Sequence, residues 1–362
     1  MSNFKFAWMS DTHLGYRQYG LERRERDFQL AFINAIQLVI DSGCEFAINS
    51  GDILHNNRPT AQTIMCLKEA HELLKSAGIP MWVVSGNHDF SEPHWVNTIN
   101  PANDQSGIFL IDGKTVDYEG FTVYGCPWLP RDAFLASLPT IPKAEVIVWH
   151  GAIREFIGFP QASALKLDEL PLDRCQLWAA GDIHVNSVKK VGSTYVGYPG
   201  STEMNSSSED FVKVVKVVSV EDGMIVNIKD LEIATRRVLK ISISDEEEAQ
   251  ARIDELKKMS NGDRYSPMVY IEFPSDIGFD IQARFNSALN PNEFVLRFEQ
   301  DPVVREQSGD YVAVATNSLT PEEVLYQILP MNSEILPVAR RLIDPAQDAN
   351  RILDEYIDAA CK

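Results

Sequence analysis

Short apolar runs alternate with longer segments of helical periodicity over residues 4–200 of this chain. Five of the runs are Phe6–Trp8, Phe46–Ile48, Trp82–Val84, Val146–Trp149 and Leu177–Ala180. Runs of this length, bounded by turn residues and separated by helical patterns, are typical of strands buried in an α/β sheet. The pattern therefore predicts an α/β fold in which helices cover the strands.

Helical periodicity is clear in two segments between these runs. One segment repeats its apolar residues at the spacing of a helix face, at Phe28, Ala31, Phe32, Ala35 and Val39. This spacing predicts a helix over residues 24–42 that packs on the sheet. In the other segment, Thr60 is a suitable N-cap and Gly78 is placed to end the helix.

The pattern divides the chain into three parts. A first domain over residues 1–235 ends after an alternating run at Phe211–Val220 and a strand at Met224–Ile228. Residues 236–305 predict a smaller α+β unit, in which a capping box at Ser244–Glu247 opens a helix. This unit contains no cluster of ligand-type side chains, so we expect it to cap or shape a substrate site.

Residues 318–362 are predicted to form short helices. Thr320-Pro321 and Asp344-Pro345 each combine an N-cap with a proline at the first helical position. Helices this short must bury their apolar face against another surface. The sequence leaves two candidates for that surface, the chain's own domains and a partner protein.

The composition is that of a globular protein with two or three domains. The 362 residues are 44% hydrophobic and 23% charged. No stretch approaches the roughly 18 apolar residues of a membrane span, and the first residues lack a basic region followed by an apolar one. Five cysteines lack metal or redox spacing, as in a reducing cytosol. We expect a cytoplasmic protein without a membrane span.

Histidine and carboxylate side chains follow each of the five apolar runs. Five of the seven histidines lie in these blocks, which are Asp11-Thr12-His13, Gly51-Asp52-Ile53-Leu54-His55, Gly86-Asn87-His88-Asp89, His150-Gly151 and Gly181-Asp182-Ile183-His184. Ligand-type side chains at the carboxyl ends of such strands converge on one edge of a sheet. The pattern therefore indicates a metal site at that edge.

The donor set indicates which ions would bind there. Oxygen and nitrogen ligands without cysteine suit manganese best, with magnesium as the alternative. The candidate ligands exceed what one ion takes from a protein while keeping positions open for water and substrate. Two divalent ions that share one carboxylate fit better, as in phosphoesterases and nucleases whose ions lie about 3.5–4 Å apart.

The blocks resemble those of the calcineurin-like metallophosphoesterase superfamily. Within it, Asp11–Tyr16, Arg24–Phe28 and Ala31-Phe32 are similar to the opening of the nuclease subunit of SbcC–SbcD and Mre–Rad type DNA repair complexes. The resemblance is dense in motifs over residues 4–200 and continues only in layout beyond them. It implies a metallophosphoesterase β-sandwich flanked by helices.

The resemblance also implies roles for single residues. The ligands of one ion would be Asp11, His13, Asp52 and His184, and those of the other would be Asp52, Asn87, His150 and Asp182. The remaining site residues would be His88, which acts on the phosphate, Asp89, which orients it, His55, which faces the scissile phosphate, and Tyr16 with Arg17, which contact DNA.

One position departs from the family's pattern. The last block normally reads Gly-His-x-His, whereas this chain has Gly181-Asp182-Ile183-His184. Aspartate is a competent oxygen ligand, so the second ion can still bind. With aspartate at this position, the net charge of the occupied site is one unit less positive than it would be with histidine. This lower charge favours manganese or magnesium over zinc.

The net charge of −19 disfavours strong DNA binding by the chain alone. Two bound ions would add local positive charge that formal counting omits. We therefore expect weak intrinsic affinity for DNA, supplemented by a partner. The resemblance implies that this partner is an SMC-like ATPase held by the helices of residues 318–362, and it allows a homodimer.

Together these features predict a manganese-dependent DNA nuclease with exonuclease and endonuclease activity in DNA repair and recombination. Two alternatives remain open at this level. One is a small-molecule or cyclic-nucleotide phosphodiesterase on the same core, which would not need the additional unit and the helical tail. The other is a non-catalytic scaffold in which Asp182 marks decay of the site.

Overall fold

The predicted strands form two six-stranded sheets that face each other. In the computed structural model, the described residues are 3–91, 94–100, 106–157, 163–207, 209, 212–259, 266–273, 278–290 and 294–300. The first sheet has the order β12-β11-β1-β2-β3-β4, with β1 (Phe4–Met9), β2 (Phe46–Asn49), β3 (Pro80–Val83), β4 (Gly107–Leu110), β11 (Val214–Glu221) and β12 (Met224–Glu232). Its strands β1 to β4 are parallel, and β11 and β12 extend it as an antiparallel hairpin.

The second sheet has the order β5-β6-β7-β8-β10-β9. Its strands are β5 (Thr115–Tyr118), β6 (Phe121–Cys126), β7 (Val146–His150), β8 (Leu177–Gly181), β9 (Ser187–Val191) and β10 (Thr194–Tyr198). The strands β6, β7, β8 and β10 are parallel, whereas β5 and β9 pair antiparallel at the edges. The parallel strands of both sheets are buried, which explains why they are continuous apolar runs in the sequence.

Aromatic and aliphatic side chains fill the space between the two sheets. Phe6 stacks on Phe46 with 4.8 Å between ring centroids, and Trp82 lies 4.5 Å from Phe46. These residues belong to one hydrophobic cluster with Val123 and Val148 of the second sheet. The sandwich therefore has a single continuous core between its layers.

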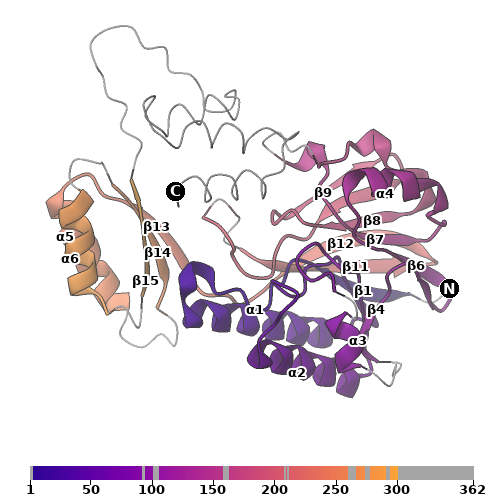
Figure 1. Ribbon diagram of the computed structural model, residues 1–362, viewed down its shortest axis with the longest axis horizontal. Helices are drawn as coiled ribbons and strands as arrows, with labels where there is room; N and C mark the ends of the chain where they lie inside the picture. The colour runs from indigo at the N-terminus through magenta and orange to yellow at the C-terminus, as the bar shows by residue number, and fades with distance from the viewer. Residues whose placement is uncertain are drawn as a thin grey trace, which may run out of the picture. The chain divides into compact units, whose positions relative to one another are not determined.

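Helices cover the outer faces of the sandwich, as Figure 1 shows. The helices α1 (Glu22–Asp41), α2 (Ala61–Ala77) and α3 (Trp95–Ile99) cover the first sheet, and α4 (Arg131–Ser137) covers the second. Short 3-10 helices occur at Gln18–Gly20, Leu138–Thr140, Arg154–Phe156, Leu167–Glu169 and Leu172–Arg174. This arrangement confirms the predicted β-sandwich flanked by helices.

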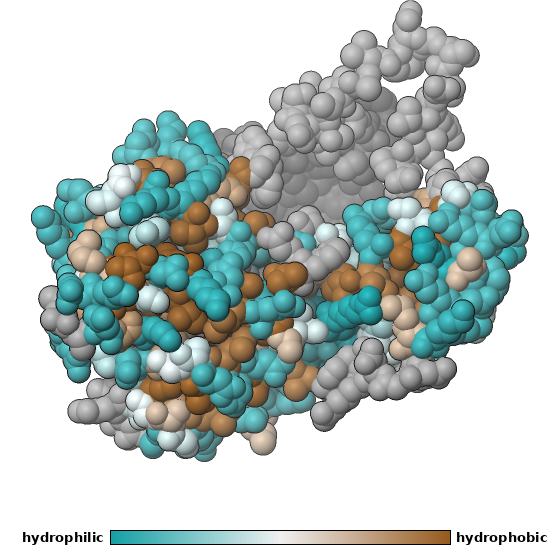
Figure 2. Space-filling view, turned by 180° about the vertical axis from the view of Figure 1, so that it is seen from behind, coloured by the Kyte–Doolittle hydropathy of each residue, from teal (hydrophilic) through white to brown (hydrophobic). Residues whose placement is uncertain are grey.

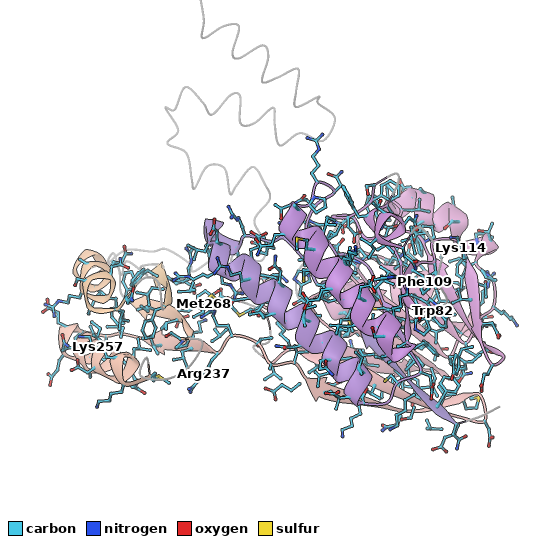
Figure 3. All side chains as sticks on the ribbon, turned by 90° about the horizontal axis from the view of Figure 1, so that it is seen from below. Trp82, Phe109, Lys114, Arg237, Lys257 and Met268 are labelled. Atoms are coloured by element: carbon cyan, nitrogen blue, oxygen red, sulfur yellow. The ribbon has the colours of Figure 1, made fainter. Side chains whose placement is uncertain are left out.

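The two long helices lie side by side along one face of the molecule (Figure 3). The Thr60 side chain accepts a hydrogen bond from the backbone N–H of Thr63, and Gly78 ends α2 in the left-handed conformation with φ 74°. Both observations confirm the boundaries that the sequence predicted for this helix. Helix α1 begins two residues before the predicted start, within the usual uncertainty of helix ends.

A third sheet follows the sandwich in the chain. It consists of β13 (Val238–Ser242), β14 (Met268–Phe273) and β15 (Val295–Gln300), which are parallel and alternate with α5 (Glu246–Met259) and α6 (Gly278–Ala288). The strands and helices share a separate hydrophobic cluster. The sequence predicted strands and a helix here but not their parallel alternation. The cap of α5 also differs, because Asp245 accepts from the Glu248 N–H where Ser244 was expected to cap.

Residues 1–303 form one compact unit by their internal contacts, and the domain boundary near residue 235 stays a prediction. The helical segment predicted at 318–362 lies outside the described residues. Among the described helices, none is long and apolar enough to cross a membrane. The face shown in Figure 2 mixes hydrophilic residues with apolar ones.

Candidate metal centre

The five ligand blocks follow strands whose carboxyl ends meet at one edge of the sandwich. Backbone hydrogen bonds join neighbouring blocks within each sheet. The Asp11 N–H donates to the Gly51 carbonyl at 3.1 Å, and the Gly151 N–H donates to the Gly181 carbonyl at 3.0 Å. Between the sheets, the Asp182 N–H donates to the Asp11 carboxylate at 3.2 Å. The sandwich therefore brings together blocks that are up to 171 residues apart in the sequence.

The first group of candidate ligands combines residues of the first and last blocks. The Nε2 atoms of His13 and His184 lie 3.1 Å apart. Oδ1 of Asp11 lies 3.7 Å from His184 Nε2, and Oδ2 of Asp52 lies 3.8 Å from His13 Nε2. All four side chains were predicted to hold one ion; the donor atoms of Asp11, His13 and His184 lie within 4.8 Å of one another, and Asp52 joins Asp11 in a second such cluster with His150.

The second group surrounds His150. Its Nε2 atom lies 3.0 Å from Oδ1 of Asn87 and 3.4 Å from Oδ2 of Asp52. Oδ1 of Asp182 is more distant, at 3.9 Å from the same nitrogen. The Asp52 oxygen that faces His150 also faces His13, so Asp52 occupies the position expected of a bridging ligand.

Four candidate ligands hold their backbone in an unusual conformation. Asp11, His13, Asp52 and Asp182 have φ values of 53°, 44°, 51° and 97°. Positive φ is uncommon for residues other than glycine and costs on the order of 1–3 kcal/mol each. Such outliers gather where the surrounding structure holds residues for a function, so their concentration here marks the centre as a functional site.

Glycines at the ends of the strands make room for the ligands. A Cβ atom on Gly86 would overlap the Asp52 carboxylate, and one on Gly51 would overlap the His150 ring. A Cβ atom on Gly181 would meet Ser50 and Ser10. The glycines in these blocks are therefore required by close approach around the donor atoms.

Opposite charges are concentrated in this buried centre. Burial opposes ionisation of Asp52, but the neighbouring His150 outweighs it, so the pKa of Asp52 is lowered. Burial likewise disfavours charge on His150, but Asp52 raises its pKa well above the ordinary value. Burial lowers the pKa of His13 well below its ordinary value and raises that of Asp11 to about 6. A cation between these groups would be compensated by the carboxylates.

The residues present fit divalent cations. The Nδ1–H of His150 donates to the Ser50 carbonyl at 2.7 Å, since a carbonyl oxygen can only accept. The Nδ1 atom of His184 lies 2.8 Å from Oε1 of Glu209. Outer partners of this kind fix the tautomer of a histidine ligand and leave its Nε2 lone pair for the metal. The remaining donors are oxygens, so each group combines imidazole nitrogen with oxygen ligands, a set that divalent cations accept.

Glu209 is a residue of this centre that the sequence analysis missed. Besides His184, its carboxylate accepts hydrogen bonds from the buried Lys213 at 2.6 Å and from Ser201 at 3.0 Å. Burial opposes the ionisation of Glu209, but the hydrogen bond from His184 and the charge of Lys213 lower its pKa to about 2. No spacing or motif marks an outer partner in a loop 25 residues after its histidine.

The predicted catalytic histidines lie beside the first group. The ring centroids of His88 and His13 are 5.0 Å apart, and those of His55 and His88 are 5.3 Å apart. The Nδ1–H of His88 donates to the His55 carbonyl at 2.9 Å. Burial, followed by the charge of His88, lowers the pKa of His55 to about 4. His55 is therefore neutral at pH 7.

Asp89 has a different set of partners from the one expected. Its carboxylate accepts from the backbone N–H groups of Ile53 at 2.7 Å and Gly86 at 2.8 Å. It thus fastens the second ligand block to the third. Within the described residues, it is the His55 carbonyl that orients the His88 ring, which is the role the sequence analysis gave to Asp89.

The predicted DNA contacts, Tyr16 and Arg17, lie next to the first block. The Tyr16 ring stacks on His55 with 4.1 Å between centroids. The Arg17 guanidinium is paired with Glu25 at 2.8 Å and with Glu22 at 3.0 Å. Tyr16 therefore supports a site histidine, and the charge of Arg17 is balanced by two carboxylates at the start of α1.

Comparisons with known proteins agree with this geometry. The model of the calcineurin-like phosphoesterase family matches residues 4–186. A protein of Methanococcus maripaludis named DNA double-strand break repair protein Mre11 is 25% identical over 307 residues, covering 75% of this chain and 78% of that protein. The Mre11 proteins of Methanocaldococcus jannaschii and Methanosarcina acetivorans are 25% identical over 276 residues and 30% identical over 247 residues. These matches cover 71% and 64% of this chain, and 74% and 39% of the relatives.

Proposed function

Because this chain belongs to the calcineurin-like phosphoesterase family, we propose that it is a metal-dependent DNA nuclease of the kind found in DNA break repair. The observation that carries the proposal is the convergence of seven ligand-type side chains, four of them with positive φ, on one largely buried centre. The substrate is inferred from the relatives, which are named DNA double-strand break repair proteins.

The two groups of ligands would hold two divalent ions, and manganese is the ion we expect. Asp11, His13, Asp52 and His184 would hold one ion, and Asp52, Asn87, His150 and Asp182 the other. When bound, such a pair clamps a phosphate and lowers the pKa of water so that hydroxide is available near neutral pH. The protein contributes buried carboxylates that compensate the charge and outer hydrogen bonds that fix the histidine rings.

His88 is proposed to handle the proton at the leaving oxygen. Because its Nδ1–H donates to the His55 carbonyl, Nε2 is the ring nitrogen that exchanges a proton. A positioned acid or base of this kind contributes about 10²–10⁴-fold to rate. His55 is neutral and fixed between the rings of Tyr16 and His88, so we assign it a positioning role toward the phosphate.

Partners are proposed from separate observations. The net charge of −19 and the pairing of Arg17 leave the chain with weak attraction for DNA, which favours a partner that supplies affinity. We assign that role to an SMC-like ATPase bound by residues 318–362, which lie outside the described residues.

A groove between α1 and α2 exposes Leu30 and Met65, with exposed fractions of 41% and 71%, and supports a homodimer through this face.

The test is a nuclease assay on duplex and single-stranded DNA with manganese, magnesium or chelator. Cleavage should require a divalent ion, and Asp52→Asn should remove most of it because both ion positions lose a carboxylate. Full activity in that variant, or in excess chelator, would contradict the two-ion site. Cleavage of small phosphodiesters without cleavage of DNA would favour a small-molecule phosphodiesterase instead.

A further inference from the structure

Two aromatic rings lie beside the metal centre without being part of the hydrophobic core. Phe90 directly follows the Asn87-His88-Asp89 block and is 53% exposed. Its ring lies 6.4 Å from that of Trp128, at an angle of 52°. Isolated exposed apolar residues are normal, but this pair stands at the edge of a candidate active site. Its position, more than its exposure, calls for a function.

A small pocket joins Trp128 to the candidate ligands. Its volume is about 170 Å³, and Asn87, His150 and Asp182 line it together with Trp128 and Trp149. This is less than the roughly 300–1,000 Å³ of a pocket for a whole small molecule. The pocket therefore fits a part of a ligand whose remainder lies outside it, such as one planar group.

The pocket has an aromatic wall that includes the indole of Trp149. Trp149 is 3% exposed and packs against Phe134 with 4.8 Å between ring centroids. Its buried Nε1–H has no hydrogen-bond partner among the described residues. Arg131 also lines the pocket, with its guanidinium held by Glu169 at 2.7 Å. Planar, partly polar groups match such a wall better than aliphatic ones do.

We propose that Phe90 and Trp128 form an aromatic platform that stacks the nucleobase of the nucleotide next to the scissile phosphate. This inference rests on the proposed nuclease function and adds a base subsite to it. Stacking on an aromatic side chain tolerates every base, because each base has a π-face. The platform thus provides a contact that does not depend on sequence, in a chain whose net charge of −19 disfavours attraction of the phosphate backbone.

The platform also specifies the form of the substrate. A base inside a duplex has both faces covered by its neighbours, so it can stack on protein only after it leaves the helix. Unstacking is least costly for single strands and frayed ends. The site therefore takes unpaired nucleotides at the position next to the scissile phosphate, and an intact duplex must fray there first.

The test compares a single-stranded oligonucleotide with copies that carry one abasic nucleotide at successive positions. With manganese, the wild-type protein should cleave more slowly, by about 5–100-fold, at phosphates next to the abasic position, which is the effect of one stacked base. Phe90→Ala/Trp128→Ala should cleave intact and abasic strands alike. Trp128→Phe, which keeps a ring at this position, should show the same difference as the wild type, and Met224→Ala, which shortens an exposed residue on β12, should behave as wild type.

Binding gives a measurement independent of catalysis. Fluorescence anisotropy of the labelled strands with metal-free protein should show tighter binding of the intact strand, and the double variant should lose this preference. Equal treatment of intact and abasic strands by the wild-type protein, in cleavage and in binding, would overturn the platform while leaving the nuclease proposal intact. If the wild-type protein cleaves no DNA, the nuclease proposal fails, and the anisotropy comparison alone decides whether the platform binds bases.

Discussion

Asp182 occupies a backbone conformation that few residue types tolerate. Its φ is 97°, and its carboxylate lies 3.9 Å from His150 as a candidate ligand of one ion only. Asp182→Asn keeps the shape and suits positive φ, but it removes the charge. We predict that manganese binds this variant with one site weakened and the other unchanged, whereas Asp182→His keeps both sites. Calorimetric titration measures the manganese affinity of each site. Unchanged affinity at both sites in the asparagine variant would show that Asp182 is not a ligand.

Glu209 acts on the centre through His184. A carboxylate behind a metal-binding histidine typically changes metal affinity by about 10–100-fold. We predict that Glu209→Ala weakens manganese binding at the His184 site by this factor. The variant also leaves Lys213 buried and unpaired, which by itself costs roughly 3–5 kcal/mol of stability.

The double variant Glu209→Ala/Lys213→Met separates the two effects. It removes the unpaired charge, so stability should recover in a thermal or denaturant melt while the manganese affinity stays low. Wild-type affinity in the double variant would show that Glu209 serves only to pair with Lys213.

At this scale the sequence predicted the candidate ligands that the structure brings together, but not the residues that hold them in place. Asp52 and His150 could be found because each lies in a ligand block that follows an apolar run. Ser50, whose carbonyl orients His150, and Glu209 have no such signal, because a hydrogen bond across the fold leaves no local pattern. Asp89 was found by its position, yet its backbone partners depend on how two loops approach each other.

Glycines at the ends of elements allow a matched comparison. Gly86 follows β3 where a Cβ atom would overlap Asp52, whereas Gly78 ends α2 with open space around it. We predict that Gly86→Ala displaces the bridging carboxylate and lowers manganese affinity at both sites. Gly78→Ala should leave binding unchanged and cost about 1–2 kcal/mol in unfolding free energy, since its φ is 74°. Equal manganese binding in both variants would contradict the close-approach argument.

Elements with strong local signals were predicted well. The cap and the terminal glycine of α2 are chemical requirements of a helix end, so they are visible in the sequence. The parallel order of β13, β14 and β15 is not visible, because helix and strand patterns are the same whichever way the strands pair. The N-cap of α5 is Asp245 and not the predicted Ser244, because both adjacent residue types can serve as N-caps.

At the scale of the molecule, buried ion pairs connect helix α1 to the chain that leads into the third sheet. Arg24 is fully buried and contacts Asp27 at 2.7 Å and Glu203 at 3.0 Å. Asp27 is also shared with Arg236, two residues before β13. This charge network therefore links α1 to the segment that leads into the third sheet.

Arg236 is the residue through which this link can be tested. Its guanidinium donates to both Asp27 oxygens at 2.7 and 2.8 Å and to the carbonyl of Ser266, two residues before β14. We predict that Arg236→Ala lowers unfolding stability by a few kcal/mol, on the order of the roughly 3–5 kcal/mol of a broken buried pair. Hydrogen exchange should quicken in β13 and β14, while manganese affinity is unchanged.

The control is Arg237→Ala, at the exposed neighbour labelled in Figure 3, which should change neither the stability nor the hydrogen exchange. Equal exchange in both variants would show that the ion pairs are not needed to hold the third sheet. The apolar contacts of Met268 and Tyr270 with Met204 would then be sufficient.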